Sequence, residues 1–194
     1  AIFETIYYGA MSCSNELAIK NKPYESFKGS PLSEGKFAFD LWDVEATRFK
    51  WDELRERVKR YGTVNSLLIA CMPTASTAQI NGNTESFEPC TSNLYVRRVL
   101  SGEFMIVNKN LENMCRKQGL WTDKLVNRII QDKGSVQNTD LPDTIKNTFK
   151  TVWEISNKAI IDMSADRAAF VCQSQSLNLY LQNPNEGAIS SMQV

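Results

Sequence analysis

Three hydroxyl side chains stand within four positions near the middle of the chain, directly after a short apolar run. They belong to Thr74, Ser76 and Thr77, with only Ala75 among them, and the apolar run is "SLLIA", residues 66–70. If the run is a strand and a helix starts just after it, the first backbone N–H groups of that helix lack internal partners and carry the positive end of the helix dipole. Such a helix start, with small hydroxyl side chains around it, favours a bound phosphate.

The cations of the sequence lie away from this segment. No Lys or Arg occurs between residues 61 and 96, so a phosphate would be held by hydrogen bonds and would be released readily.

A second interpretation of the same residues needs no ligand. Ser76 and Gln79 stand in the S-x-x-Q pattern of a capping box, in which both side chains bond to the backbone at the start of a helix. From the residues alone, capping and phosphate binding both remain open.

Histidine is absent from the 194 residues. This excludes the commonest general base, the Ser-His and Cys-His nucleophile pairs and the H-E-x-x-H zinc site. Any catalysis by this chain alone would depend on carboxylates, Lys, Tyr or Cys.

The charges are balanced, with 22 Lys plus Arg and 22 Asp plus Glu. A nucleic-acid-binding protein usually carries a basic excess or a basic stripe, and neither is present. No apolar run approaches the roughly 18 residues of a membrane span. We therefore expect neither nucleic acid nor a membrane as a partner, and a cytoplasmic location.

Five cysteines are scattered along the chain without a C-x-x-C pair, which gives no redox or zinc motif. They are Cys13, Cys71, Cys90, Cys115 and Cys172. Cys71 and Cys172 lie in apolar runs, so we expect free core thiols in a reducing, intracellular compartment.

Periodicity and turn residues predict alternating helices and strands, hence an α/β fold. The predicted helices cover residues 2–18 and 51–61, segments capped by Asn108 and Thr122, and a long region from about 140 to 170. The predicted strands are residues 37–41, 66–70, a hairpin of 93–100 with 103–107 around Ser101-Gly102, and 176–181.

Other polar residues receive ordinary structural interpretations. Arg97 and Arg98 are neighbours on a strand and point to opposite faces, so at most one could meet a phosphate, and surface or salt-bridge roles are favoured. Glu85 and Glu88 are interpreted as polar loop residues. The segment 173–176 either lines a barrel or caps the preceding helix, and both remain open.

Longer stretches resemble one known family. "YESFKGSPLSEGKF", "PTASTAQINGNTESFEPCTSNLYVRRVLSGEF" and "KTVWEISNKAIIDMSADRAAFVCQSQSLNLYL" occur in this order. They are similar to the large (alpha, catalytic) subunit of class I ribonucleotide reductase, of the eukaryotic and large-DNA-virus type. The resemblance covers nearly the whole chain.

The resemblance carries expectations about fold and site. It implies an α/β fold that is part of the ten-stranded α/β barrel of these subunits, with residues 1–194 as a single partial domain, the C-terminal portion of the catalytic barrel, and both ends truncated. "PTAST" is similar to the loop that holds the substrate diphosphate. The implied phosphate-binding residues are Thr74, Ala75, Ser76 and Thr77.

The family reduces ribonucleoside diphosphates to deoxyribonucleoside diphosphates by a thiyl-radical mechanism, which implies a role in DNA replication. Its radical and redox cysteines are expected outside this segment, so no catalytic residue, metal ligand or cofactor is assigned here. Tyr7-Tyr8 is not assigned to the tyrosine pair of the radical relay, because Tyr7 has the spacing of a core residue.

The partners and cofactors are also implied by the family. They are a small subunit with a dimetal–tyrosyl radical, a second large subunit, thioredoxin or glutaredoxin, and ATP and deoxynucleotide effectors that act allosterically. The isolated segment is expected to be inactive. Two alternatives remain: a natural split half that needs a complementary chain, and a non-enzymatic protein-binding module on the same scaffold.

Overall fold

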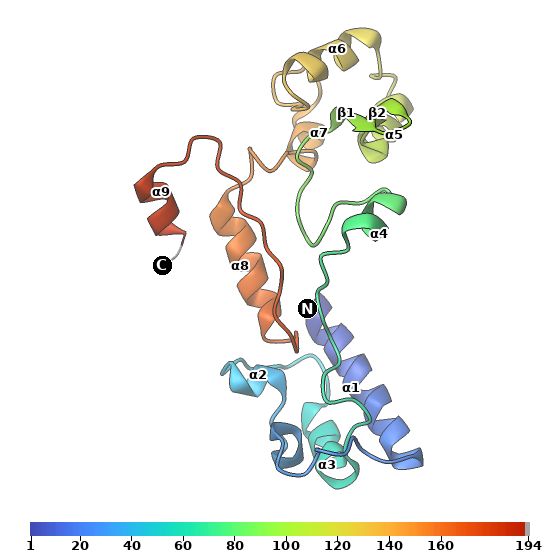
Figure 1. The fold of residues 1–194 in the computed structure, drawn as a ribbon, viewed down its shortest axis with the longest axis vertical. Helices are drawn as coiled ribbons and strands as arrows, with labels where there is room; N and C mark the ends of the chain where they lie inside the picture. Colours follow the sequence, from blue (N-terminus) through green and yellow to red (C-terminus); the bar gives the residue numbers. More distant parts are fainter. Residues whose placement is uncertain (193–194) are drawn as a thin grey trace. The chain divides into compact units, whose positions relative to one another are not determined.

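The computed structural model describes residues 1–192 (Figure 1). The chain forms two compact units. Unit 1 comprises residues 1–73 and 162–176, and unit 2 comprises residues 74–161 and the segment that starts at Leu177. Helix α8 (Asn157–Ala168) has residues in both.

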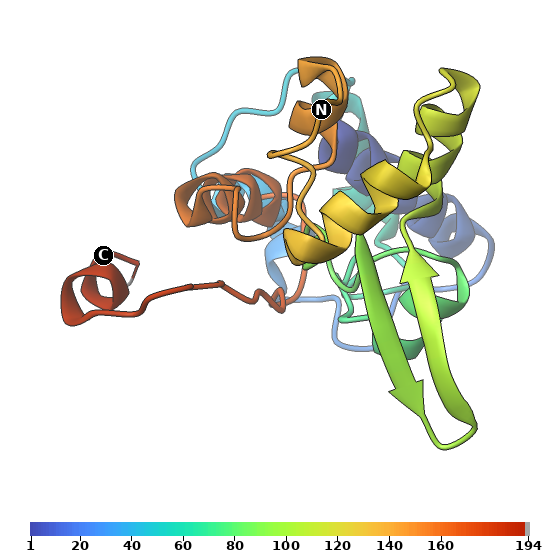
Figure 2. The same cartoon turned by 90° about the horizontal axis from the view of Figure 1, so that it is seen from above.

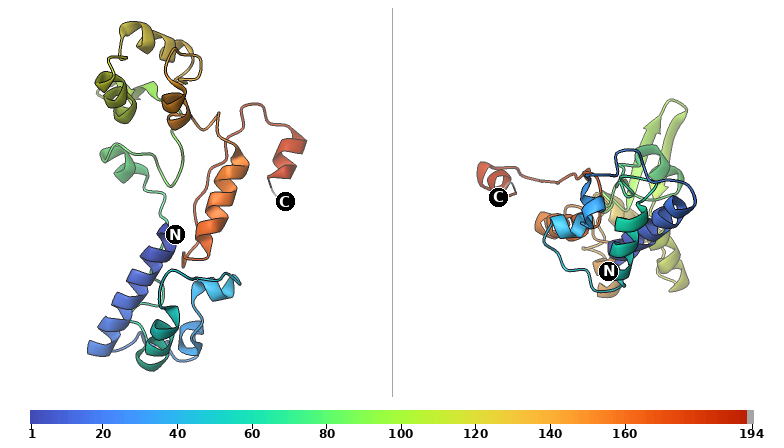
Figure 3. Two further views of the ribbon diagram at one scale, coloured as in Figure 1. Left: turned by 180° about the vertical axis from the view of Figure 1, so that it is seen from behind. Right: turned by 90° about the horizontal axis from the view of Figure 1, so that it is seen from below.

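Unit 1 is helical. Its further elements are α1 (Ile2–Lys20), the 3-10 helix η1 (Pro31–Glu34), α2 (Ala38–Leu41) and α3 (Trp51–Tyr61). Figure 3 shows α1 alongside α3, and the two helices are in contact. The predicted helices at 2–18 and 51–61 are therefore confirmed.

The core of unit 1 is built from aromatic side chains around Tyr7. The Tyr7 ring lies 5.8 Å from that of Trp51, 6.4 Å from Phe37 and 6.5 Å from Phe170. Its hydroxyl accepts a hydrogen bond from the backbone N–H of Ala38 (3.2 Å), and burial raises its pKa. The interpretation of Tyr7 as a core residue is confirmed.

The predicted strand at residues 37–41 is wrong, because this segment forms the short helix α2. The Asp40 carboxylate accepts a hydrogen bond from the Phe37 N–H (2.7 Å) and so holds the first turn closed. Phe37 and Phe39 are both buried in the same aromatic core. The apolar alternation that suggested a strand arises because Phe37 and Phe39, two residues apart at the start of α2, are both buried in this core.

The predicted strand at residues 66–70 is also wrong, because this segment is not a β-strand in the structure. The segment's contacts include one backbone hydrogen bond, from Cys172 N to Ile69 O (3.0 Å). Leu67 is exposed rather than buried. A strand buried on both faces needs a hydrogen-bonded neighbour along its length, and a single bond does not supply one.

Unit 2 contains a hairpin and several short helices. Its elements are α4 (Ala75–Ile80), β1 (Leu94–Val99), β2 (Gly102–Val107), α5 (Lys109–Lys117), α6 (Asp123–Gln131), α7 (Asp143–Thr148) and α9 (Glu186–Ser191). The strands pair antiparallel, with Arg97 opposite Phe104 and Arg98 opposite Glu103, and Figure 2 shows them running together to their turn. This confirms the predicted hairpin.

The helix starts predicted at Asn108 and Thr122 are confirmed. The Asn108 side chain accepts hydrogen bonds from the N–H groups of Asn110 and Leu111, and Thr122 accepts one from Leu125. These are ordinary N-caps, which satisfy donors that the helix itself leaves unpaired.

The long helical region predicted at 140–170 is wrong, because residues 149–156 separate α7 from α8. Within this break the Val152 N–H donates to the carbonyl of Cys90 (2.9 Å), and the Thr151 N–H donates to the Glu154 carboxylate (2.8 Å). A bond to a distant segment and a local side-chain bond therefore take the place of helical hydrogen bonds at these two residues. The predicted strand at 176–181 likewise receives no strand assignment.

The Asn93 side chain holds four segments of unit 2 together. It is 1% exposed, and its Nδ2 donates to the carbonyls of Gly134 (3.1 Å) and Phe149 (2.8 Å). Its Oδ1 accepts from the side chain of Asn108 (3.0 Å). Gly134 has φ of 88°, and a Cβ there would overlap the Ser92 side chain. Glycine is therefore required where these two segments meet.

No helix within residues 1–192 combines the length and the apolar character that crossing a lipid bilayer requires.

We expect Asn93→Ala to lower the free energy of unfolding by about 3 kcal/mol, because it removes three buried side-chain hydrogen bonds and leaves the Phe149 carbonyl without this partner. Urea unfolding of the chain measures this. The matched control is Asn127→Ala on the exposed face of α6, which should change stability by less than about 0.5 kcal/mol. Equal effects of the two substitutions would contradict the role given to Asn93.

Candidate functional site

The structure places Thr74, Ala75, Ser76 and Thr77 in one turn at the start of α4. Thr74 is the N-cap residue, in the left-handed region with φ of 56° and ψ of 23°, and its side chain makes no capping hydrogen bond. Because the helix begins at Ala75, Ser76 lies inside it. The capping-box interpretation, which needs Ser76 at the N-cap, is therefore wrong.

The donors at this helix start face outward. The first helical hydrogen bond runs from Ala78 N to Thr74 O (2.7 Å), so the N–H groups of residues 75–77 precede the ladder and have no helical acceptor. Residues 74–77 are all exposed. The turn thus presents three backbone donors and three hydroxyls on one short stretch.

Contacts at the C-terminal end of α4, and in the loop after it, hold the turn in place. Ala78 is the buried residue of α4. After the helix, the Asn83 N–H donates back to the Ala78 carbonyl (2.8 Å), and the Gln79 side chain donates to the Glu85 carboxylate (3.2 Å). The position of the donors therefore depends on the loop that follows.

Glu88 lies in that loop and is buried, with 8% of its surface exposed. Its carboxylate accepts hydrogen bonds from the Asn178 amide (2.7 Å) and from the Tyr180 hydroxyl (2.7 Å). The interpretation of Glu88 as a plain loop residue missed this cluster. No local signal marks it, because its partners stand 90 and 92 positions away in the chain.

A cavity of about 810 Å³ in unit 2 adjoins the same loop. Its walls come from the end of α4, the loop with Glu85 and Glu88, both strands of the hairpin, and Tyr180. Arg97 lines it, whereas Arg98 makes an ion pair with Glu103 across the hairpin (2.6 Å from Nε to Oε1). The two arginines therefore differ in role, and the salt-bridge interpretation is confirmed for Arg98.

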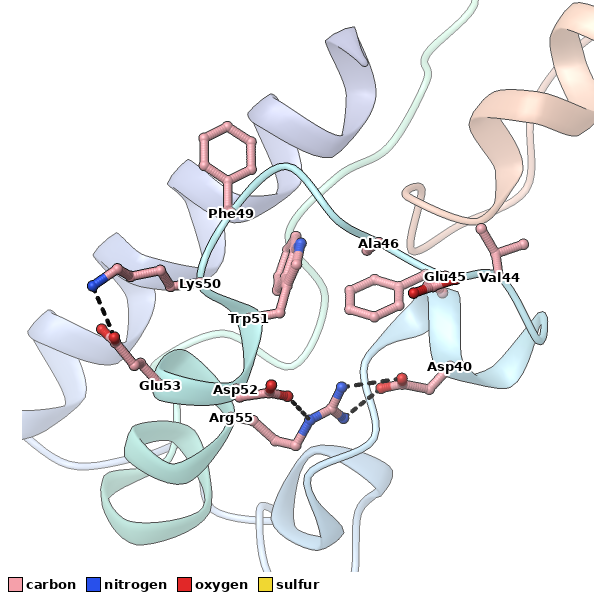
Figure 4. Close-up of a pocket in the computed structure, with 11 residues that line it drawn as sticks. Asp40, Val44, Glu45, Ala46, Phe49, Lys50, Trp51, Asp52, Glu53 and Arg55 are labelled. Atoms are coloured by element: carbon pink, nitrogen blue, oxygen red, sulfur yellow. Dashed lines mark hydrogen bonds and ion pairs between the residues drawn. The ribbon is translucent and has the colours of Figure 1, made fainter.

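Unit 1 has a smaller pocket of about 430 Å³, drawn in Figure 4. Its two cations are paired with acids: Arg55 contacts Asp40 (2.6 and 3.1 Å), and Lys50 contacts Glu53 (2.9 Å). The hydrogen bond to Asp40 raises the pKa of Arg55. With both cations paired to carboxylates, this pocket is a poor site for a phosphate.

The cysteines differ in exposure. Cys115 is buried and Cys13 is exposed, and all five are free thiols. Burial raises the pKa of Cys115, Cys90 and Cys71, which lowers the reactive thiolate fraction. Cys71 and Cys172, expected in the core, are half-buried.

Within segment 173–176, Gln175 contacts the preceding helix. Its amide donates to the Ser164 carbonyl (3.1 Å), and its oxygen accepts from the Arg167 guanidinium (2.6 Å). Among residues 1–192, no three His, Cys, Asp or Glu side chains are grouped so as to hold a metal ion.

Residues 1–194 match the family described as "Ribonucleotide reductase, barrel domain". The chain is 53% identical over 192 residues to the "Ribonucleoside-diphosphate reductase large subunit" of Vaccinia virus (strain Copenhagen), covering 98% of this chain and 25% of the viral protein. It is 54% identical over 194 residues to the "Ribonucleoside-diphosphate reductase large chain" of Cryptosporidium parvum, covering 98% and 24%. The chain thus spans about a quarter of the length of the curated relatives it matches.

A solved structure agrees with these relatives. The "Actinobacillus ureae class Id ribonucleotide reductase alpha subunit" superposes with a TM-score of 0.66 at 28% identity, covering 94% of this chain and 28% of that one.

We expect a thiol-specific reagent to label Cys13 first and Cys115 only after unfolding, because exposure and thiolate character govern reactivity. Mass spectrometry of peptides after timed labelling measures the order. Rapid labelling of Cys115 in the folded chain would show that its surroundings open readily, contrary to its complete burial.

Proposed function

Because the chain belongs to the ribonucleotide reductase barrel-domain family, we propose that Thr74–Thr77 bind the diphosphate of a ribonucleoside diphosphate substrate. The family match extends over residues 1–194 and confirms both the resemblance and the predicted fold class, part of an α/β barrel. The observation that carries the proposal is the exposed helix start with its unpaired N–H groups and hydroxyls.

The chemistry of the turn fits a phosphate well. Residues 75–77 offer N–H groups that point along the helix axis toward its N-terminus, which is the positive end of the dipole. The hydroxyls of Ser76 and Thr77 can donate to further oxygens. Since no Lys or Arg occurs between residues 61 and 96, the diphosphate is held mainly by hydrogen bonds and leaves readily after reaction.

The wider proposal follows the named relatives. The chain forms the C-terminal portion of a catalytic barrel in a ribonucleoside-diphosphate reductase large chain, which acts in deoxyribonucleotide synthesis in the cytoplasm. It works with a radical-generating small subunit, a second large subunit, and thioredoxin or glutaredoxin. ATP and deoxynucleotides regulate it from outside this segment.

We predict that Ser76→Ala and Thr77→Val each lower kcat/KM for a ribonucleoside diphosphate about tenfold or more, because each removes a hydrogen bond to a charged group. The assay uses a reductase large chain that carries these residues, assembled with its small subunit. Both side chains are exposed, so the fold should be unaffected.

Ser26→Ala is the matched control, since Ser26 is also an exposed hydroxyl but lies in unit 1. It should leave the kinetics unchanged. If the two variants of the turn behave like this control, the phosphate-binding role is wrong.

We also predict that the 194-residue chain, without the rest of a large subunit, reduces no ribonucleoside diphosphate, because its five cysteines lack the setting of the family's radical and redox thiols. Product formation is measured by chromatography with the small subunit and a dithiol reductant present. Turnover under these conditions would place the catalytic thiol within this chain.

A further inference from the structure

The buried carboxylate of Glu88 lies outside the turn 74–77 for which phosphate binding is proposed, and its hydrogen bonds go to Asn178 and Tyr180. Charged groups are rarely buried unless hydrogen bonds replace the lost water. Here each carboxylate oxygen accepts one short bond: Oε1 from the Asn178 amide and Oε2 from the Tyr180 hydroxyl, both at 2.7 Å. Such charge-assisted bonds are stronger than neutral ones, so this contact between distant segments is firm.

The Tyr180 side of the contact is itself anchored. Asn157, at the start of α8, exchanges hydrogen bonds with the Tyr180 backbone, donating to its carbonyl (2.9 Å) and accepting from its N–H (3.4 Å). The Tyr180 ring packs edge-on against Trp153, with centroids 5.7 Å apart. Burial, and then the bond to Glu88, raises the Tyr180 pKa to about 12, so the hydroxyl remains a donor at neutral pH.

The Glu88 side of the contact leads directly to α4. The Thr84 hydroxyl donates to the Glu88 carbonyl (2.5 Å), and the Glu88 N–H donates to the Glu85 carbonyl (3.1 Å). Glu85 in turn accepts from Gln79 on α4 (3.2 Å). Residues 84–88 therefore form one closed turn, which is bonded to α4 at one end and to Tyr180 at the other.

Helix α4 has little else to hold it. It has six residues, of which Ala78 is buried, and a helix this short is not stable by itself in water. Its position is therefore set by the segment to which it is tied. We propose that Glu88 is a positioning residue, whose carboxylate fixes α4 against the segment 178–180.

The consequence for binding rests on the proposed function of residues 74–77. If those residues hold a diphosphate, Glu88 aligns their N–H groups through the turn 84–88. Loss of the carboxylate then weakens substrate binding without removing any group that touches the substrate.

The first experiment observes α4 in the full chain. The backbone amide signals of residues 75–83 are compared by NMR in the native chain, Glu88→Ala, Glu88→Gln and Tyr180→Phe. Glu88→Ala should shift or broaden these signals, whereas Glu88→Gln should largely restore them, because a glutamine can accept from Asn178 and donate to the Tyr180 oxygen. Glu112→Gln on α5, whose carboxylate pairs with Arg116, is the matched control.

Signals of α4 that stay unchanged in Glu88→Ala would overturn the proposal. If Glu88→Ala unfolds unit 2 as a whole, Tyr180→Phe decides, because it removes one hydrogen bond and retains the ring on Trp153. Signals of 75–83 must then move in Tyr180→Phe, and unchanged signals overturn the proposal equally.

The second experiment measures kinetics in a large chain that carries these residues, assembled with its small subunit. Glu88→Ala should raise KM for a ribonucleoside diphosphate about tenfold with kcat changed less than about threefold, and Glu88→Gln should recover most of the loss. A general structural defect would instead lower kcat through loss of folded enzyme, and glutamine would not rescue it.

The two proposals fail in different ways. If Glu88→Ala moves α4 but Ser76→Ala and Thr77→Val leave the kinetics unchanged, Glu88 positions α4 and the phosphate role is wrong. If the hydroxyl variants impair binding while Glu88→Ala leaves both α4 and KM unchanged, the phosphate role stands and the positioning role is wrong.

Discussion

Unit 2 depends on the hydrogen bonds of one buried amide, the side chain of Asn93. It joins the start of β1 to the turn at Gly134, to the carbonyl of Phe149 and to the cap residue Asn108. The Phe149 carbonyl would otherwise lose this buried hydrogen bond, which is costly inside a protein, and the Gly134 carbonyl accepts from both the backbone and the side chain of Asn93. The helices of this unit share an apolar core that includes Leu111, Ile129 and Ile145, and the amide adds directed bonds to it.

Asn15 has the same function in unit 1. It is completely buried, and its Nδ2 donates to the carbonyls of Arg57 and Gly62 at the end of α3. The aromatic side chains around Tyr7 belong to the apolar core there, but apolar contact has no direction. The amide adds direction, because its donors fit only one register of α1 against α3.

The turn at residues 74–77, proposed here to bind phosphate, differs from these buried amides, because binding a ligand would require its donors to stay unpaired. Residues 74–77 lie on the surface with their N–H groups free of helical acceptors, so they contribute little to folding. Their geometry has to come from elsewhere: from the buried Ala78, from the turn 84–88, and from the carboxylate of Glu88. A stable polar cluster behind the turn thus lets the turn itself remain open.

The sequence by itself determined the local features: the helices predicted at 2–18 and 51–61, the caps at Asn108 and Thr122, the hairpin, and the candidate turn at 74–77. Each depends on neighbouring residues, through periodicity, cap chemistry or turn residues. The tertiary structure alone decided the break between α7 and α8, the helix at 38–41 and the extended course of 66–70 and 176–181. It also decided the burial of Glu88. Such features depend on partners far away in the chain, such as Cys90 for Val152 and Tyr180 for Glu88.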